Sequence, residues 1–276
     1  MAILIDDGVL AAPIRVPLTE GWVASSIPVE VRHHLQATDV GPGDIALIST
    51  AEVTRAAETH VVAPDVAVVV EGIGDIVMRT PVRPDGVEET PIRLIDISST
   101  GEMLIRALLR PFFGITASTF VTSDEDAEAT KAEVAIVEGL DALHEPEAGF
   151  QSDLAQAWYI LTGTNLVSHV VIIGLEAQAR GIGDEAVAIL AQAAEVGAER
   201  KRDVRSAIAG DADVDREKLA ELTNNLRFSL TPTDRGSLTN LIARGTWGSR
   251  FPRRNPVFRD TLPDDLQTPI TTEDNA

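Results

Sequence analysis

Three hydroxyl residues stand where an apolar run gives way to a helical pattern, and their chemistry suits anion binding. Ile92–Ile97 predicts a buried strand and Gly101–Arg110 a helix, so Ser98, Ser99 and Thr100 fall at the helix N-terminus. The free N–H groups and the positive dipole end of a helix N-terminus favour a carboxylate or phosphate, and the hydroxyls add donors. Ordinary helix capping is the other interpretation of this cluster.

A second strand end repeats the arrangement. Ile45–Ser49 predicts a short apolar strand that delivers Ser49 and Thr50 to a helix over 51–57. If the two helix N-termini face each other, together they could hold one dianion, although capping explains these residues as well. At the first junction, Gly101 would also let a ligand approach the backbone closely.

A third group of neutral donors follows a predicted helix over Ser152–Thr162. Thr162, Gly163, Thr164 and Asn165 form a turn there, ahead of the next apolar strand. Thr164 and Asn165 could line a cleft at a hinge. Gly163 taken alone is better explained as the residue that ends the helix.

Acid–base and metal candidates are few. The five histidines include no HxxxH spacing, and His33 and His34 are expected on the exposed side of a helix over Val29–Gln36. Glu138 ends a predicted strand over Val134–Glu138 and Asp141 follows it closely, so either could enter a cleft, with a structural cap the favoured role. The sequence therefore assigns no catalytic residue and predicts neither a metal site nor a cofactor.

Composition narrows the classes of partner and location. The chain has 276 residues, a formal net charge of −20 and no cysteine, which argues against nucleic acid and anionic membranes as partners and excludes disulfides. Asp6 and Asp7 interrupt the N-terminal apolar stretch, so no secretory signal is expected and the protein is predicted to be cytoplasmic. No apolar run reaches the ~18–20 residues of a membrane span.

Strand-like and helical segments alternate along the first half, which predicts an α/β fold with a mostly parallel sheet. The expected architecture has two lobes and two hinge crossover strands, Ile76–Arg79 and His169–Gly174. Lobe 1 is predicted over 1–75 plus 175–250 and lobe 2 over 76–174, with an extended or disordered acidic tail over 251–276. A ligand would bind in the cleft between the lobes.

Several segments, in their order and spacing, resemble the futalosine-pathway menaquinone biosynthesis family, of which chorismate dehydratase is the best-known activity. The similarity spans roughly residues 8–250. The segments that carry it are PVEVRHHL (28–35), GDIALISTAEV (43–53), VAPDVAVVVEG (62–72), IRLIDISSTGEMLIRALLRPFFG (92–114), AIVEGLDAL (135–143) and SDLAQAWYILTGTNL (152–166).

The resemblance implies a type II periplasmic-binding-protein fold that closes on a small anionic or cyclic carboxylate. It also implies that the protein is a lyase if it dehydrates chorismate or a related cyclic carboxylate. The sequence departs from the family pattern at three places. The turn TGTNL (162–166) replaces an aromatic-rich turn of the family. Ala11 and Ala12 stand near the family's N-terminal Asn, and Asp75 follows the hinge glycine where the family often has a basic residue. A non-catalytic solute-binding or sensor protein on the same fold is therefore the alternative function. The sequence does not predict the oligomeric state.

Overall fold

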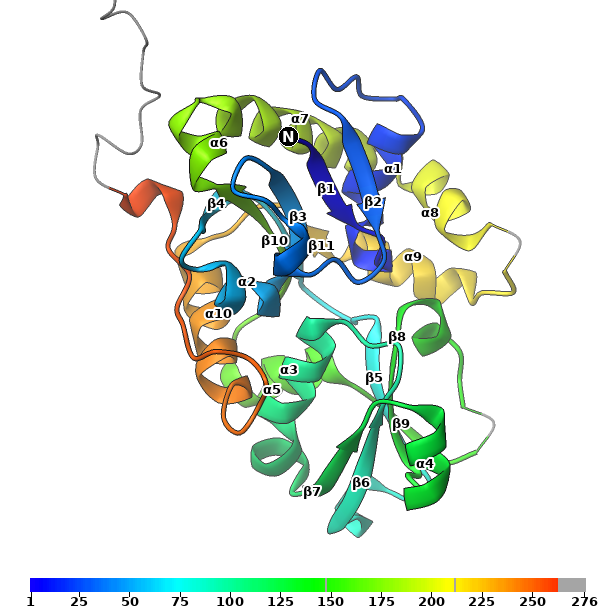
Figure 1. Ribbon diagram of the computed structural model, residues 1–276. Coiled ribbons are helices and arrows are strands. Elements are labelled where there is room, and N and C mark those ends of the chain that lie inside the picture. Colours follow the sequence, from blue (N-terminus) through cyan, green and yellow to red (C-terminus); the bar gives the residue numbers. More distant parts are fainter. Residues whose placement is uncertain (147, 211, 263–276) are drawn as a thin grey trace, which may run out of the picture.

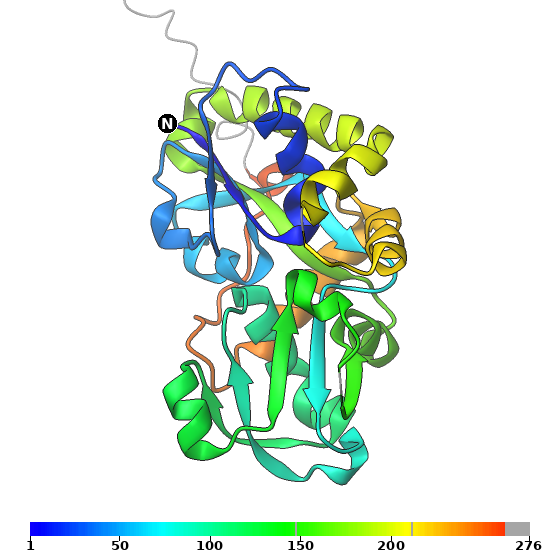
Figure 2. The ribbon, with the colours of Figure 1, turned by 90° about the vertical axis from the view of Figure 1, so that its right-hand side faces the viewer.

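The computed structural model describes residues 1–146, 148–210 and 212–262, and it has two stacked lobes (Figures 1 and 2). Lobe 1 denotes the six-stranded sheet with its helices, and lobe 2 the five-stranded sheet with its helices. Each lobe is an α/β layer structure, as the alternation of strand and helix patterns predicts. The sheets are mixed rather than mostly parallel, because β10 and β5 each run antiparallel to both of their neighbours.

The sheet of lobe 1 has the order β11-β4-β10-β3-β1-β2. Its strands are β1 (Ile3–Asp6), β2 (Val29–Arg32), β3 (Ile45–Ser49), β4 (His60–Val70), β10 (Leu166–Gly174) and β11 (Leu226–Arg227). The helices of this lobe are α1 (Ala12–Thr19), α2 (Val53–Ala56), α6 (Leu175–Ala179), α7 (Ile182–Glu199), α8 (Lys201–Ala209), α9 (Arg216–Asn224) and α10 (Pro232–Gly245).

The sheet of lobe 2 has the order β7-β6-β8-β5-β9. Its strands are β5 (Ile76–Thr80), β6 (Glu89–Leu94), β7 (Thr116–Val121), β8 (Val134–Glu138) and β9 (Phe150–Asp153). Its helices are α3 (Ser99–Leu108), α4 (Asp124–Thr130) and α5 (Leu154–Thr162). The helices predicted over 101–110, 152–162, 184–196, 201–208 and 216–226 are confirmed, with ends that differ by a few residues.

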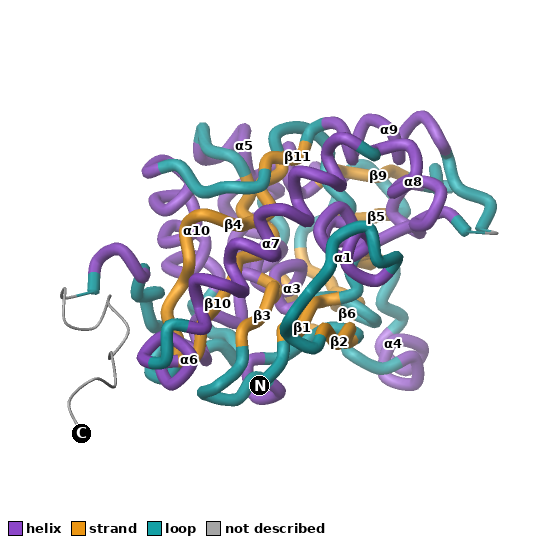
Figure 3. The backbone as a smooth tube through the Cα atoms, turned by 90° about the horizontal axis from the view of Figure 1, so that it is seen from above, coloured by secondary structure: helices purple, strands orange, loops and turns teal. Residues whose placement is uncertain are grey.

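Continuous apolar runs form the middle of lobe 1, because both faces of its central strands are covered. Every residue of β3 and β10 is buried. Helix α7 packs across β4 and β10 with α1 beside it (Figure 3), and α10 also contacts β10. Such double coverage explains why these strands are buried along their whole length, with polar side chains only at Ser49, Ser168 and His169 and not at every second position.

The chain passes between the lobes twice, from β4 to β5 and from α5 to β10. Residues 166–174 differ from the expected division, since β10 lies between β3 and β4 in the sheet of lobe 1. Helix α10 of lobe 1 also packs against α3 of lobe 2. A Cβ on Gly245 would lie only 2.3 Å from Met103 Cγ, so the two helices approach closely.

Two regions of lobe 1 contradict the predicted secondary structure. The helix expected over Val29–Gln36 is wrong: Val29–Arg32 is strand β2, in which residues alternate between half-buried and exposed. Helix α1 was not predicted. It contains Pro17 in its interior and Pro13 in its first turn, where proline is tolerated.

Part of the predicted C-terminal tail is packed on the protein. Phe251 is buried, and Phe258 forms an isolated bridge with Val62 of β4. Residues 263–276 lie outside the described residues. Among the helices that the structure describes, none has the length and apolar character needed to span a membrane.

Candidate functional site

A cleft between the lobes, with a volume of about 290 Å³, collects residues from several strand ends. Strands β1 and β2 are parallel to each other in lobe 1, and β6 and β8 are parallel in lobe 2. The carboxyl ends of parallel strands share one edge of a sheet, which is where ligands bind in open α/β sheets. The ionisable residues that line the cleft are Asp6, Asp7, His33, His34, Asp75, Asp96, Glu138 and Asp141.

Asp75 and Glu138 form a pair of carboxyl groups at the floor of this cleft. Asp75 precedes β5 and is 2% exposed, and its Oδ1 atom has no hydrogen-bond partner among the described residues. Glu138 ends β8, and the N–H of Gly139 donates to the backbone oxygen of Asp75 at 2.8 Å. Burial, reinforced by the charge of Glu138, raises the pKa of Asp75 well above its usual range.

Glu138 differs from Asp75 in having a donor. The N–H of Ser98 donates to Glu138 Oε2 at 2.7 Å. Burial raises the pKa of Glu138, while the hydrogen bonds from Ser98 oppose that rise. When the pair carries one negative charge, this contact favours placing it on Glu138, so that Asp75 keeps its proton.

Asp6 is the charged, structural carboxylate of the site. It is 1% exposed and accepts hydrogen bonds from the N–H groups of Gly8 and Leu35, both at 2.9 Å. Its Oδ1 lies 3.7 Å from Nε2 of His169 on β10. Burial alone would raise the pKa of Asp6, but the nearby His169 and the two N–H donors outweigh it and lower the pKa.

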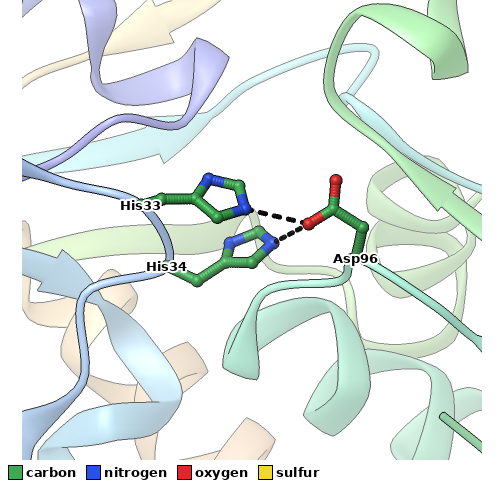
Figure 4. A group of neighbouring side chains, drawn as sticks. All are labelled: His33, His34 and Asp96. Carbon is green, nitrogen blue, oxygen red and sulfur yellow. Dashed lines mark hydrogen bonds and ion pairs between the residues drawn. The ribbon is translucent and has the colours of Figure 1, made fainter. Parts of the chain in front are cut away.

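His33 and His34 meet Asp96 at the cleft mouth (Figure 4). Asp96 Oδ1 lies 2.9 Å from His33 Nε2 and 3.1 Å from His34 Nε2. Nδ1 of His33 lies 3.1 Å from both carboxylate oxygens of Asp7. The hydrogen bond with Asp96 raises the pKa of His33 despite partial burial, with Asp7 adding to the effect.

The two hydroxyl junctions predicted from the sequence do meet, and they pack against each other. Ser49 Oγ and Thr100 Oγ1 are 2.6 Å apart, and the N–H of Thr100 donates to Ser49 Oγ at 2.9 Å. Ala51 N–H donates to Thr100 Oγ1 at 3.2 Å. These contacts join lobe 2 to lobe 1. Thr50 is buried, and its hydroxyl has no hydrogen-bond partner among the described residues.

The N-terminus of α3 holds an anion, which is the protein's own Glu138. Ser98 is the N-cap residue, and its Oγ accepts from the N–H of Gly101 at 3.1 Å while its own N–H donates to Glu138. Ser99 Oγ donates to Glu52 at 2.5 Å. A Cβ at Gly101 would lie 2.8 Å from Glu138 Oε2. The missing side chain thus leaves room for this internal carboxylate.

The third predicted group lies elsewhere. Gly163 ends α5 with a φ of 70°, as its interpretation as a helix-ending residue predicts. Thr162 Oγ1 is 2.9 Å from Thr164 Oγ1, which donates to Ser237 Oγ. Asn165 lines a separate cavity of about 350 Å³ beside the β4–β5 connection.

Comparison with known proteins identifies the family. The family model described as menaquinone biosynthesis matches residues 13–246. The chain belongs to the menaquinone biosynthesis family. The resemblance stated from the sequence segments is thereby confirmed. No curated protein matches the sequence.

Solved structures agree with the expected type II periplasmic-binding-protein fold of this menaquinone biosynthesis family member. Protein AF1704 from Archaeoglobus fulgidus is similar with a TM-score of 0.65 and 12% identity, covering 89% of this chain and 97% of its own. The ligand-binding component of an ABC-type import system from Staphylococcus aureus, with zinc bound, has a TM-score of 0.59 and 10% identity, and 97% of each chain is covered. The alkanesulfonate-binding protein SsuA from Xanthomonas axonopodis pv. citri, bound to MOPS, has a TM-score of 0.54 and 11% identity, covering 88% of this chain and 91% of its own.

The sequence did not single out Asp7 or Asp96 for the cleft of this menaquinone biosynthesis protein. Asp96 was placed inside an expected strand over 92–97, whereas β6 ends at Leu94. The available signal was a polar residue directly after each of several apolar strands. Asp7 follows β1, His33 follows β2, and Asp96 stands two residues after β6.

Proposed function

We propose that this protein is a carbon–oxygen lyase that binds a small cyclic hydroxycarboxylate between its lobes, with chorismate as the first candidate. The observation that carries the proposal is the carboxyl pair Asp75 and Glu138, which line the same cleft and differ in their hydrogen bonds. Two titratable groups whose surroundings separate their proton affinities can act as acid and base. Proton donation and removal are the steps that loss of water requires.

In the proposed reaction Glu138 accepts a proton from the ring carbon, and Asp75 donates its proton to the departing hydroxyl group. One C–H bond and one C–O bond break, one C=C bond forms, and water leaves. A proton passing from Glu138 to Asp75 then restores the starting state. When the substrate ring is one double bond short of aromaticity, formation of the aromatic product supplies much of the driving force.

The cleft also suits a small ligand by size. Its volume of about 290 Å³ is near the lower end of the ~300–1,000 Å³ usual for ligand pockets. The similar structures include proteins whose names specify an alkanesulfonate or bound zinc, which supports a small-molecule ligand. A carboxylate ligand would lie among six carboxyl side chains, which repel it where they are charged. The proton on Asp75 therefore favours entry of the ligand as well as catalysis.

The test is incubation of the full chain with chorismate, followed by detection of an enolpyruvyl benzoate product and of a ligand-induced rise in melting temperature. Asp75→Asn removes the proposed acid and is expected to lower the rate by about 10²–10⁴-fold. Asp85→Asn is the matched control, because it makes the same Asp-to-Asn replacement at a side chain that is 73% exposed in the same lobe. Absence of both product and stabilisation would remove chorismate as the ligand.

The alternative function is a non-catalytic solute-binding or sensor protein on the same fold. It is favoured by the internal use of the α3 N-terminus, whose Ser98 N–H is already bonded to Glu138. Stabilisation by carboxylates without any product would support this function and contradict the lyase. The cytoplasmic location inferred from the sequence stays a prediction, which fractionation of the native cells would check.

A further inference from the structure

His33, His34 and Asp96 converge on one point at the mouth of the cleft, and they come from both lobes (Figure 4). His33 and His34 follow β2 in lobe 1, while Asp96 follows β6 in lobe 2. Both imidazole Nε2 atoms are directed at the same carboxylate oxygen, Asp96 Oδ1. Potential ligand atoms of the three side chains all lie within 4.8 Å of one another.

Two imidazole nitrogens and one carboxylate oxygen are a donor set that zinc uses in catalytic sites. With bonds of about 2.0–2.1 Å, tetrahedral coordination places neighbouring ligand atoms roughly 3.3 Å apart. The Oδ1 atom of Asp96 is 2.9 Å from His33 Nε2 and 3.1 Å from His34 Nε2. Small rotations of these side chains would therefore admit an ion.

A second carboxylate holds the far side of one imidazole. Nδ1 of His33 lies 3.1 Å from Oδ1 and Oδ2 of Asp7, which leaves Nε2 directed at Asp96 and His34. Metal-ligating histidines usually donate their other ring N–H to a carboxylate or carbonyl in this way, which fixes the ring orientation and makes the ligating nitrogen more basic. This contact distinguishes the group from a chance cluster of surface charges.

Access and charge also fit a cation from solution. The side chains of His33 and Asp96 are 61% and 71% exposed, and that of His34 is 29% exposed. Asp6, Glu138 and Asp141 line the same cleft, and the chain carries a formal charge of −20. Such a concentration of negative groups raises the local concentration of cations.

We propose that His33, His34 and Asp96 form a binding site for a divalent transition-metal ion, with zinc as the best-fitting ion. The ion is held by the two Nε2 atoms and the Asp96 carboxylate, so it links the two lobes at the cleft mouth. Three protein ligands leave a coordination position for water or for an oxygen of a ligand in the cleft. The sequence predicted no metal site, because adjacent histidines lack the spacing of known helical motifs.

The test is calorimetric titration of the full chain, freed of metal with a chelator, with zinc chloride in the absence of any organic ligand. We expect one high-affinity site per chain. The double substitution His33→Ala with His34→Ala should weaken that affinity at least 100-fold. Asp7→Asn should weaken it by about 10-fold, because it removes only the carboxylate behind His33.

His144→Ala is the matched control, since it removes a histidine that does not line the cleft, and it should leave the affinity unchanged. Circular dichroism and melting temperatures check that each variant is folded. Cobalt substitution gives an independent measurement: visible absorption of the tetrahedral ion should appear with wild type and be lost in the double variant. No zinc binding, or binding that the double variant retains in full, would overturn the site.

The result is independent of the proposed reaction. Zinc binding without dehydration of chorismate would leave the metal site standing and remove the lyase. Dehydration of chorismate by a chelator-treated chain that binds no zinc would support the lyase and overturn the metal site.

Discussion

Replacing Asp75 with asparagine should make the protein less sensitive to alkaline pH. The raised pKa of Asp75 means that the folded state resists ionisation of this group, whereas the unfolded chain ionises it near its ordinary value of 3.8. Wild type therefore loses stability as pH rises from about 3.8 through the folded-state pKa, and the loss is constant above that value. The asparagine side chain cannot ionise, so the variant lacks this loss.

The magnitude follows from the unpaired Oδ1 atom of a side chain that is 2% exposed. A buried polar atom without a partner costs about 1–3 kcal/mol, and more when it is charged. In proteins of comparable size, 1 kcal/mol shifts the melting temperature by about 2–4 °C. The melting temperature of Asp75→Asn minus that of wild type should thus increase by about 2–12 °C between pH 4 and pH 8.

The assay is differential scanning calorimetry of both proteins at several pH values. Only the pH-dependent part of the difference in melting temperature is diagnostic. The new amide group of Asp75→Asn also lacks a hydrogen-bond partner, but the free-energy cost of that does not vary with pH. Asp85→Asn again serves as control, since the exposed side chain removes one charge from the overall repulsion without changing a buried group. A difference that stays constant from pH 4 to pH 8, or one that Asp85→Asn reproduces, would refute the reasoning.

Three further substitutions test the packing and the other buried carboxylate. Gly197→Ala should destabilise the fold by about 1–3 kcal/mol in urea unfolding, because its Cβ would lie 1.8 Å from the backbone oxygen of Pro13. Gly236→Ala in α10 should instead stabilise it by about 0.5–1 kcal/mol, since no atom lies within 4 Å of the added Cβ; the same sign for both variants would contradict this view of the helix contacts. Asp6→Asn should lose about 1–3 kcal/mol at pH 7, because the lowered pKa of Asp6 stabilises the fold above pH 3.8. That deficit should shrink as pH falls through the lowered pKa, and a deficit independent of pH would show that the charge of Asp6 is not its source.

Local patterns predicted the elements whose signals are local. The apolar run of β3 and the cap at Ser98 were found because burial on both faces and helix capping each leave a mark within a few residues. Strand β2 was misread although VEVR alternates with a period of two, the pattern of a half-exposed strand. Helix α1 was missed because two prolines argue against a helix.

The site was harder to predict because its chemistry is tertiary. Nothing near Ser98 in the sequence shows that the anion at this helix terminus is Glu138, forty residues further along the chain. The charge state of Asp75 depends on its burial in the assembled fold and on the nearby Glu138, so a residue that stands in the sequence as a negative charge can contact a carboxylate as a neutral acid. His33 and Asp96 become neighbours only when the two lobes are assembled.

The central position of β10 determines the order in which the protein can be assembled during synthesis. Residues 76–162 are contiguous, so the sheet of lobe 2 is complete before β10 (Leu166–Gly174) has been made. Until then β3 and β4 have no strand between them, and their apolar edges are open to wrong pairing. Lobe 1 begins first in the sequence but is completed last, because β10, β11 and the helices α6 to α10 all follow the segment that forms lobe 2.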